Sequence, residues 1–295
     1  MIEKIALGAA QLGGQYGITN TEPKLNLEKI EEIISYAKNN GIKTIDTAIN
    51  YDSESYFNDI DLSDLKINSK LPKVPSRVKK INEWIGQKIY ESLENLDISN
   101  INCLFLHNPN QLFEKKGEEI WRSLENLKQE KLVKKIGVSI YDPYQLDEID
   151  FLYGFDVIQS PFNLLDRRLQ HSGWFKKKEK KGIEVQVRSV FLQGLLLLKK
   201  DKLPEEFLKW TKLWEKLDLF LNKNNYSNLD LLLSFIKSFE EIDTIILGID
   251  NLIQLKEIIN AMNTEINHFP DIYSQDENLI NPLNWDLYKN NKKEF

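Results

Sequence analysis

The chain has 295 residues, of which 41% are hydrophobic, so it can bury a sizeable core and is not globally disordered. This length suits one large α/β barrel or two smaller domains. The formal net charge is −6 and no long basic stripe occurs, which argues against nucleic acid binding as the main role.

Short β-branched or apolar runs alternate along the chain with longer amphipathic segments. The candidate strands are residues 4–9, 44–48, 67–71, 102–107, 135–140, 157–160, 184–189 and 244–248. The clearest helical segments are residues 27–39, 78–96, 115–129 and 229–238; in the first, Ile30, Ile33, Ile34 and Ala37 recur at helical spacing. Eight strands, each followed by a helix or loop, predict a parallel sheet closed into a (β/α)₈ TIM barrel.

A doubly wound open sheet is the alternative fold. No G-x-G-x-x-G pattern opens a helix after the first strand, which argues against it. No linker or short-period repeat divides the sequence, so we expect a single domain. Residues 1–263 should form the barrel, and the polar, irregular residues 264–295 a C-terminal tail that packs on or near it.

The single cysteine, Cys103, lies in the apolar run of residues 101–106, so we expect a small buried hydrophobic side chain. It cannot form an internal disulfide, which fits a reducing compartment. The N-terminus has no signal-peptide pattern, and the longest apolar runs are far too short to span a membrane. We therefore expect a cytoplasmic protein without membrane contact, and its oligomeric state stays open.

Four polar residues stand at or just after the ends of three successive predicted strands: Asp46, Tyr51, Lys70 and His107. In such barrels the catalytic groups sit at the C-terminal ends of the strands. Each residue alone has an ordinary structural explanation, such as a helix cap for the aspartate. Their order on adjacent strands instead favours a common site.

The chemistry of this set is that of carbonyl reduction. Hydride transfer to a carbonyl leaves an alkoxide that needs a proton, and Tyr51 can donate it. Lys70 favours the phenolate that remains, and Asp46 can hold Lys70 charged and oriented. His107 can hydrogen-bond the substrate oxygen.

The sequence resembles the aldo-keto reductase superfamily along nearly the whole predicted barrel. The resemblance rests on Leu7-Gly8, Ile45-Asp46-Thr47-Ala48 with Tyr51, Lys70, Leu106-His107-Asn108-Pro109, Ile136-Gly137-Val138-Ser139, Gln159, Phe162-Asn163-Leu164-Leu165-Asp166-Arg167, and Gly248 with Gln254 and Glu257. It implies an NAD(P)H-dependent reductase with Asp46, Tyr51, Lys70 and His107 as the catalytic tetrad, and it implies no metal.

The resemblance also implies a set of cofactor-binding residues. These are Ser139 and Gln159 for the carboxamide, Ser189, Leu192 and Gly194 with Lys199 nearby for the pyrophosphate, and Gly248, Asp250, Gln254 and Glu257 for the adenosine end. Arg188 stands where the family usually stacks an aromatic ring on the nicotinamide. Its planar guanidinium can stack there or bind an anionic substrate.

Two further departures from the family pattern concern the cofactor. Ile140 follows Ser139 where the family usually has Asn, so one carboxamide contact is lost. Asp250 stands where NADP-preferring members often have Arg or Ser, and a carboxylate repels a 2′-phosphate. Cofactor choice between NADP(H) and NAD(H) therefore stays open, and Asp250 could instead cap the helix that begins near Asn251.

A narrower resemblance is to short bacterial members linked to surface-polysaccharide or flagellar sugar synthesis. It rests on Ala9-Ala10-Gln11-Leu12-Gly13, Tyr16-Gly17-Ile18 and Arg188-Ser189-Val190-Phe191-Leu192-Gln193-Gly194. It implies a small-molecule carbonyl substrate that is a sugar or nucleotide-sugar derivative. Two alternatives remain open, a cofactor-binding regulatory barrel without turnover and a sugar-phosphate isomerase or lyase, but neither explains why Tyr51 and Lys70 occur together.

Overall fold

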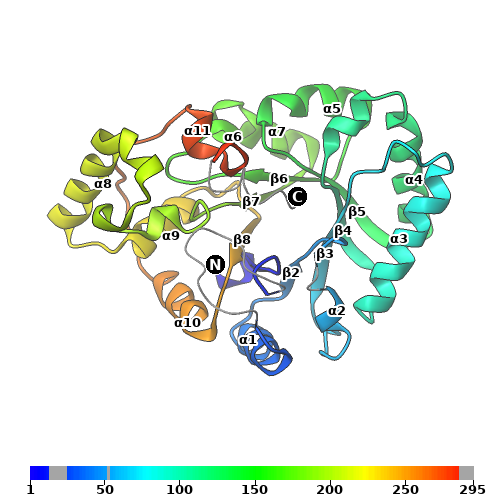
Figure 1. Cartoon of the computed structure of the whole chain (residues 1–295), viewed down its shortest axis with the longest axis horizontal. Coiled ribbons are helices and arrows are strands. Elements are labelled where there is room, and N and C mark those ends of the chain that lie inside the picture. Colours follow the sequence, from blue (N-terminus) through cyan, green and yellow to red (C-terminus); the bar gives the residue numbers. More distant parts are fainter. Residues whose placement is uncertain (13–24, 52–53, 286–295) are drawn as a thin grey trace.

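The computed structural model describes residues 1–12, 25–51 and 54–285. Within this part of the chain, eight parallel strands in chain order close into a barrel, with β8 paired to β1 (Figure 1). Helices interleave with the strands and surround the barrel, which confirms the predicted single-domain (β/α)₈ fold. The strands are β1 Ile5–Gly8, β2 Thr44–Asp46, β3 Lys66–Leu71, β4 Ile101–Leu106, β5 Val133–Ser139, β6 Val157–Pro161, β7 Glu184–Arg188 and β8 Thr244–Gly248.

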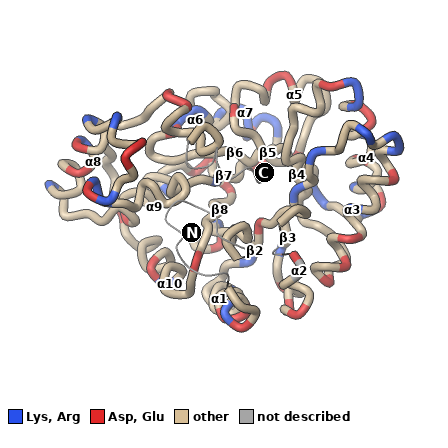
Figure 2. The backbone as a smooth tube through the Cα atoms, viewed as in Figure 1, with Lys and Arg blue, Asp and Glu red and all other residues tan. Residues whose placement is uncertain are grey.

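The α-helices lie between the strands and after β8. They are α1 Leu27–Asn39, α2 Glu54–Phe57, α3 Ile81–Asn95, α4 Gly117–Gln129, α5 Leu146–Leu152, α6 Arg168–His171, α7 Trp174–Lys181, α8 Thr211–Asn224, α9 Asn228–Lys237, α10 Leu252–Ala261 and α11 Glu277–Ile280. Lys, Arg, Asp and Glu are interspersed over the outer helices and loops (Figure 2). None of the described helices is long and apolar enough to cross a membrane.

Alternate residues of each strand face the helices or the barrel interior. Outward side chains such as Ile45, Leu104 and Val187 join the main hydrophobic core between strands and helices. Cys103 is fully buried, as predicted, in a separate small cluster with Phe105 and Val157.

The Phe105 ring needs space that β5 provides. Gly137 is its register partner on β5, and a Cβ atom at that position would lie 2.4 Å from the ring. Any larger residue at 137 would therefore force Phe105 or the strand to move. This close approach explains the glycine in the β5 run.

Much of the barrel interior is polar. Asn68 donates to Gln186 Oε1 over 3.3 Å and accepts from the Asn102 amide over 2.8 Å. Lys135 of β5 pairs with Glu184 of β7. Barrels of this kind are usually filled by bulky branched side chains, whereas here amide contacts satisfy buried polar groups and a partly exposed ion pair lies near the N-terminal end of β7.

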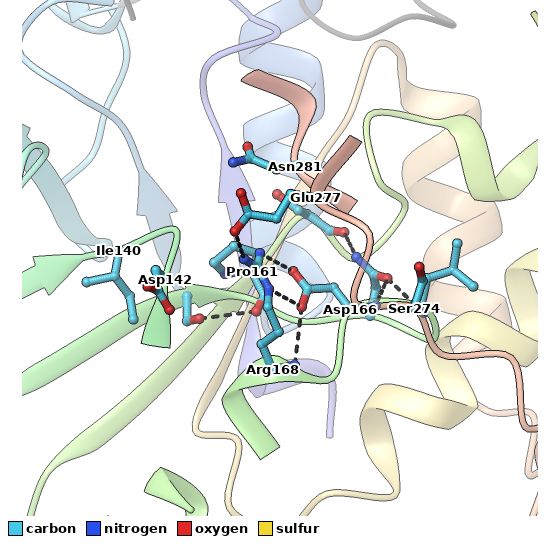
Figure 3. A network of polar contacts seen from close by, with 12 residues as sticks. Ile140, Asp142, Pro161, Asp166, Arg168, Ser274, Glu277 and Asn281 are labelled. Atoms are coloured by element: carbon cyan, nitrogen blue, oxygen red, sulfur yellow. Dashed lines mark hydrogen bonds and ion pairs between the residues drawn. The ribbon is translucent and has the colours of Figure 1, made fainter. Parts of the chain in front are cut away.

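The chain after α10 packs onto the helices around the barrel. Trp285 is buried with its ring centroid 4.7 Å from that of Phe207. Arg168 bridges the buried Asp166 after β6 and Glu277 of α11, which holds this segment close to the C-terminal ends of the strands (Figure 3). Residues 286–295 of the expected tail lie outside the described residues.

Candidate active site

A cavity of about 380 Å³ opens at the C-terminal ends of the strands, within the range of small-molecule sites. Asp46 is the last residue of β2, Lys70 is the penultimate residue of β3, and His107 directly follows β4. Tyr51 comes from the loop after β2. All four predicted catalytic residues contribute to the wall of this one cavity.

A buried ion pair forms the floor of the site. The Lys70 ammonium donates to Asp46 Oδ1 and, over 2.8 Å, to the Thr47 carbonyl. Gln159 of β6 donates its amide to Asp46 Oδ2 over 2.7 Å. Burial lowers the pKa of Lys70, and the Asp46 carboxylate opposes this effect. The pair therefore places the Lys70 nitrogen in the cavity wall, where Asp46 favours its charged form.

Tyr51 and His107 stand beside this cation. The Lys70 Nζ atom lies 5.6 Å from the centroid of the Tyr51 ring, and the Tyr51 and His107 ring centroids are 6.2 Å apart, edge to face. Burial, followed by the positive charges of Lys70 and Arg188, lowers the pKa of His107 to about 3. Its imidazole is therefore neutral near pH 7, with one N–H donor and one acceptor nitrogen.

Most of the predicted cofactor-binding residues line the same cavity. They are Ser139, Arg188, Ser189, Gly194, Gly248, Asp250, Gln254 and Glu257. The loop after β7 has left-handed backbone at three non-glycine residues, with φ of 57° at Ser189, 48° at Leu192 and 58° at Gln193. Such conformations store strain and cluster at ligand sites.

Three predicted cofactor residues do not line the cavity. Gln159 is fully buried below it, where its amide holds Asp46 and accepts from the Ser139 hydroxyl over 3.2 Å. Leu192 points into the core and is 0% exposed, because its backbone turns there with positive φ. Lys199 follows the short helix η4, Leu195–Leu197, and lines a neighbouring surface groove instead.

Arg188, the last residue of β7, faces the cavity, and the groups that contact its guanidinium are uncharged. Its guanidinium carbon lies 4.2 Å from the centroid of the Tyr141 ring, and its Nη2 donates to the Ile140 carbonyl over 3.0 Å. Ile140 therefore contributes its backbone carbonyl where its side chain offers no hydrogen bond. Nη1 also donates to Ser189 Oγ over 3.3 Å.

Asp250 does not cap α10, so that alternative is wrong. The N-cap is Asn251, whose side-chain oxygen accepts from the Gln254 backbone N–H over 2.9 Å. Asp250 is buried, and its two oxygens accept from Gln11 over 2.6 Å and from the Gln254 amide over 3.2 Å. Its carboxylate is thereby fixed in the cavity wall.

Sequence reasoning did not assign three further residues to the site. Gln11 crosses from the end of β1 to Asp250, and Tyr141 supports Arg188. Glu54, three residues after Tyr51, is buried and accepts from Ser69 and Ser92 hydroxyls over 2.9 Å each. A glutamate this close to Tyr51 was the available signal, whereas the roles of Gln11 and Tyr141 depend on contacts across the barrel.

The cavity suits a nicotinamide dinucleotide. Hydroxyl and amide groups surround one part of it, the left-handed loop borders another, and the carboxylates of Asp250 and Glu257 can accept from ribose hydroxyls. A side chain at position 248 would displace Gln11, because an added Cβ would lie 1.5 Å from Gln11 Oε1. The hydrogen-bond donors and acceptors of the wall, and the close approach that a glycine backbone allows, match such a ligand.

Comparisons with known proteins agree with this geometry. The profile of the aldo/keto reductase family matches residues 4–269. The holo form of an aldo-keto reductase from Bacillus halodurans superposes with a TM-score of 0.72 at 21% identity, covering 90% of this chain and 88% of that one.

Two further structures give similar values. A thermostable aldo-keto reductase in complex with the inhibitor epalrestat has a TM-score of 0.68 at 20% identity, covering 90% of this chain and 91% of that one. A putative aldo-keto reductase from Pseudomonas aeruginosa has a TM-score of 0.64 at 17% identity and covers 88% of both chains. At these identities the likeness shows a shared fold. The search of curated proteins found no match.

Proposed function

Because the chain belongs to the aldo/keto reductase family, it is an NAD(P)H-dependent oxidoreductase that acts on carbonyls, and we propose that Tyr51 is its proton donor. The observation that carries the proposal is the buried lysine close to this tyrosine. Lys70 is paired with Asp46 and lies 5.6 Å from the Tyr51 ring in the wall of one cavity.

When bound, the nicotinamide ring supplies the hydride that the carbonyl carbon accepts. Tyr51 gives its hydroxyl proton to the carbonyl oxygen, which becomes the alcohol. The Lys70 ammonium stabilises the phenolate left on Tyr51, and Asp46 favours the charged form of Lys70 despite its burial. Gln159 fixes the second oxygen of Asp46 and so keeps the pair in one orientation.

His107 orients the substrate rather than exchanging its proton. Since its pKa is lowered to about 3, the imidazole is neutral and can donate one N–H to the carbonyl oxygen. A donor aimed at an oxygen that gains negative charge during the reaction lowers the barrier. The positive charges of Lys70 and Arg188 near this oxygen act in the same sense.

We assign the holding of the cofactor to the other residues of the cavity wall. Ser139 would bind the carboxamide, the loop with Ser189 and Gly194 the pyrophosphate, and the turn from Gly248 to Glu257 the adenosine ribose. Their common place in one cavity supports this assignment.

The substrate and the location are finer proposals. A sugar or nucleotide-sugar carbonyl as substrate is supported by residues 9–12 and 188–194, which carry the resemblance to members linked to sugar synthesis. The other residues of that resemblance, Gly13 and Tyr16-Gly17-Ile18, lie outside the described residues. A cytoplasmic location is supported by the single buried cysteine.

The experiment that tests the function mixes the purified protein with NADH or NADPH and a panel of simple and sugar-derived aldehydes, and follows the loss of nicotinamide absorbance. Tyr51→Phe removes the proton donor but keeps the ring, so turnover should fall by roughly 10²–10⁴-fold while the cofactor still binds. Tyr90→Phe, at an exposed position of α3, is the matched control. Undiminished turnover in Tyr51→Phe would assign the proton to another group.

A further inference from the structure

The cavity wall contains two cations, Lys70 and Arg188, and they differ in how their charge is compensated. Lys70 is neutralised by Asp46. Arg188 forms no ion pair with any residue in the described ranges. Arg168, after the adjacent strand β6, does, since it binds Asp166 and Glu277. Arg188 therefore brings an uncompensated positive charge to the cavity.

The surroundings of Arg188 fix its position without cancelling this charge. The Ile140 carbonyl, the Ser189 hydroxyl and the face of the Tyr141 ring are all uncharged partners. A guanidinium has five N–H groups, and the two hydrogen bonds use one N–H on each terminal nitrogen. Three N–H groups remain for a planar, bidentate acceptor such as a carboxylate or phosphate.

The charge also acts on the reacting part of the cavity. Arg188 contributes, after burial and Lys70, to the lowered pKa of His107. A half-buried guanidinium is costly to leave without a counter-charge, and the Asp46 carboxylate is already engaged by Lys70 and Gln159. No described residue therefore supplies the counter-charge of Arg188, which leaves this role to a ligand.

We propose that Arg188 binds an anionic group, a carboxylate or a phosphate, carried by the carbonyl substrate. This inference rests on the proposed reductase activity, because it places the anion in the same cavity as Tyr51 and His107. The Tyr141 ring orients the guanidinium, and the bidentate contact positions the carbonyl at the proton donor. The enzyme therefore prefers acidic aldehydes or ketones over neutral ones of the same shape.

The test compares 4-carboxybenzaldehyde with 4-formylbenzamide, which has nearly the same shape but no charge. We expect the wild-type kcat/KM to be at least about tenfold higher for the acid, and this ratio to fall to near one in Arg188→Gln. Arg188→Lys should keep part of the preference, because lysine keeps the positive charge but cannot make the bidentate contact of a guanidinium. Arg122→Gln, which removes the same charge from an exposed site on α4, should keep the wild-type ratio.

Binding measurements separate the remaining explanations. Calorimetric titration of 4-(hydroxymethyl)benzoate and its amide, with oxidised cofactor bound, should repeat the preference and its loss in Arg188→Gln. Equal wild-type values for acid and amide, or a preference that survives in Arg188→Gln, overturn the inference. So does a tenfold weaker cofactor affinity in Arg188→Gln with the ratio unmoved, because Arg188 would then bind the cofactor phosphates. If neither aldehyde is reduced while the acid product still binds preferentially, the proposed reduction fails and the anion site stands.

Discussion

The cavity strongly changes the acid–base behaviour of His107. Burial and two neighbouring cations lower the pKa of its imidazole from 6.5 to about 3. In the unfolded chain the same side chain takes up a proton near pH 6.5. Between these two values the unfolded state binds more protons than the folded state, so stability must fall as the pH falls through this window.

This difference predicts the acid sensitivity of the fold. Below pH 6.5 the free energy of unfolding of the wild type should fall more steeply than that of His107→Gln, by up to about 1.4 kcal/mol per pH unit. Urea titrations at several pH values between 4.5 and 7.5 measure the two slopes. His268→Gln, at an exposed histidine, is the control and should follow the wild type. Parallel curves for wild type and His107→Gln would show that His107 protonates alike in both states.

At the residue scale, the sequence predicted which residues form the site better than it predicted where individual side chains point. The four catalytic candidates could be selected because strand ends meet at one mouth in any such barrel. Lys199 and Leu192 were expected near the cofactor, yet one lies in a neighbouring groove and the other in the core. Leu192 itself lies in the left-handed backbone after β7, which a leucine gives no sign of in the sequence.

At the scale of elements, Glu54 joins α2 to two neighbours. Its carboxylate accepts from Ser69 of β3, next to Lys70, and from Ser92 of α3. Burial raises the pKa of this carboxyl, and the two serine hydroxyls oppose the effect. Since the Glu54 N–H also donates to the Tyr51 carbonyl over 3.3 Å, the network positions the loop that holds the proton donor.

Removing this network should affect both stability and turnover. Glu54→Ala leaves two buried hydroxyls without their acceptor, at a cost of about 2–4 kcal/mol in the free energy of unfolding, and it should lower kcat more than it raises KM. Glu54→Gln keeps one acceptor oxygen and should lose less on both measures. Chemical denaturation and steady-state kinetics give these values.

Ser123→Ala is the matched control for this network. Its hydroxyl is buried but bonds only to the Glu119 carbonyl within its own helix, α4, over 2.8 Å. We expect a loss below about 1 kcal/mol and unchanged kinetics. A Glu54→Ala protein as stable and as active as this control would refute the positioning role of Glu54.

The contact between the loop after β6 and α11 provides a second prediction at this scale. Arg168 binds the fully buried Asp166 through two hydrogen bonds of 2.9 and 2.8 Å, and the exposed Glu277 over 3.3 Å (Figure 3). Arg168→Gln leaves Asp166 buried and unpaired, which should cost about 3–5 kcal/mol. Glu277→Gln should cost about 1 kcal/mol or less. Similar thermal stabilities for the two variants would contradict the dominance of the buried pair.

Element boundaries were predictable where the hydrophobic pattern is regular. The helix expected at residues 27–39 is α1, and the strand at 244–248 is β8, both with the expected bounds. The segment expected as a helix from residue 78 begins only at Ile81, because Val78 is still in a turn with Pro75. Short elements such as α2 and α11, four residues each, carry too few residues for a periodic signal.

At the scale of the whole molecule, the eight strand-like runs predicted that the barrel closes. They did not predict that polar side chains meet in its interior. Asn68, Gln186 and Glu184 interrupt their runs with polar residues, and nothing in one run shows which other run it meets. Only the closed register places Asn68 opposite Gln186 and Lys135 beside Glu184. The resulting cavity wall has the Lys70–Asp46 pair at β2 and β3, Arg188 at the end of β7, and the carboxylates of Asp250 and Glu257 after β8.

This distribution of charge across the mouth predicts the choice of cofactor. On the side of β8 and α10 the described wall contains Asp250 and Glu257 and no lysine or arginine. Two unit charges about 4 Å apart at an effective dielectric of about 20 interact by roughly 4 kcal/mol before screening. A 2′-phosphate placed near Asp250 would be repelled by part of that amount, whereas a ribose 2′-hydroxyl could donate to the carboxylate. We therefore expect NADH to bind as well as NADPH or better.

Gln11 and Gln254 hold Asp250 by both oxygens, so the carboxylate cannot easily turn away from a bound ribose. Asp250→Asn removes the charge with little change of shape and should shift the ratio of dissociation constants toward NADPH; Asp250→Arg should shift it further, by tenfold or more. Asp271→Asn, which removes a charge from an exposed side chain, should leave the ratio unchanged. Fluorescence titration with each cofactor measures these constants. A native preference of a hundredfold for NADPH, or a ratio that neither Asp250 variant moves, would mean that Asp250 fixes the β8–α10 turn without sensing the 2′ position.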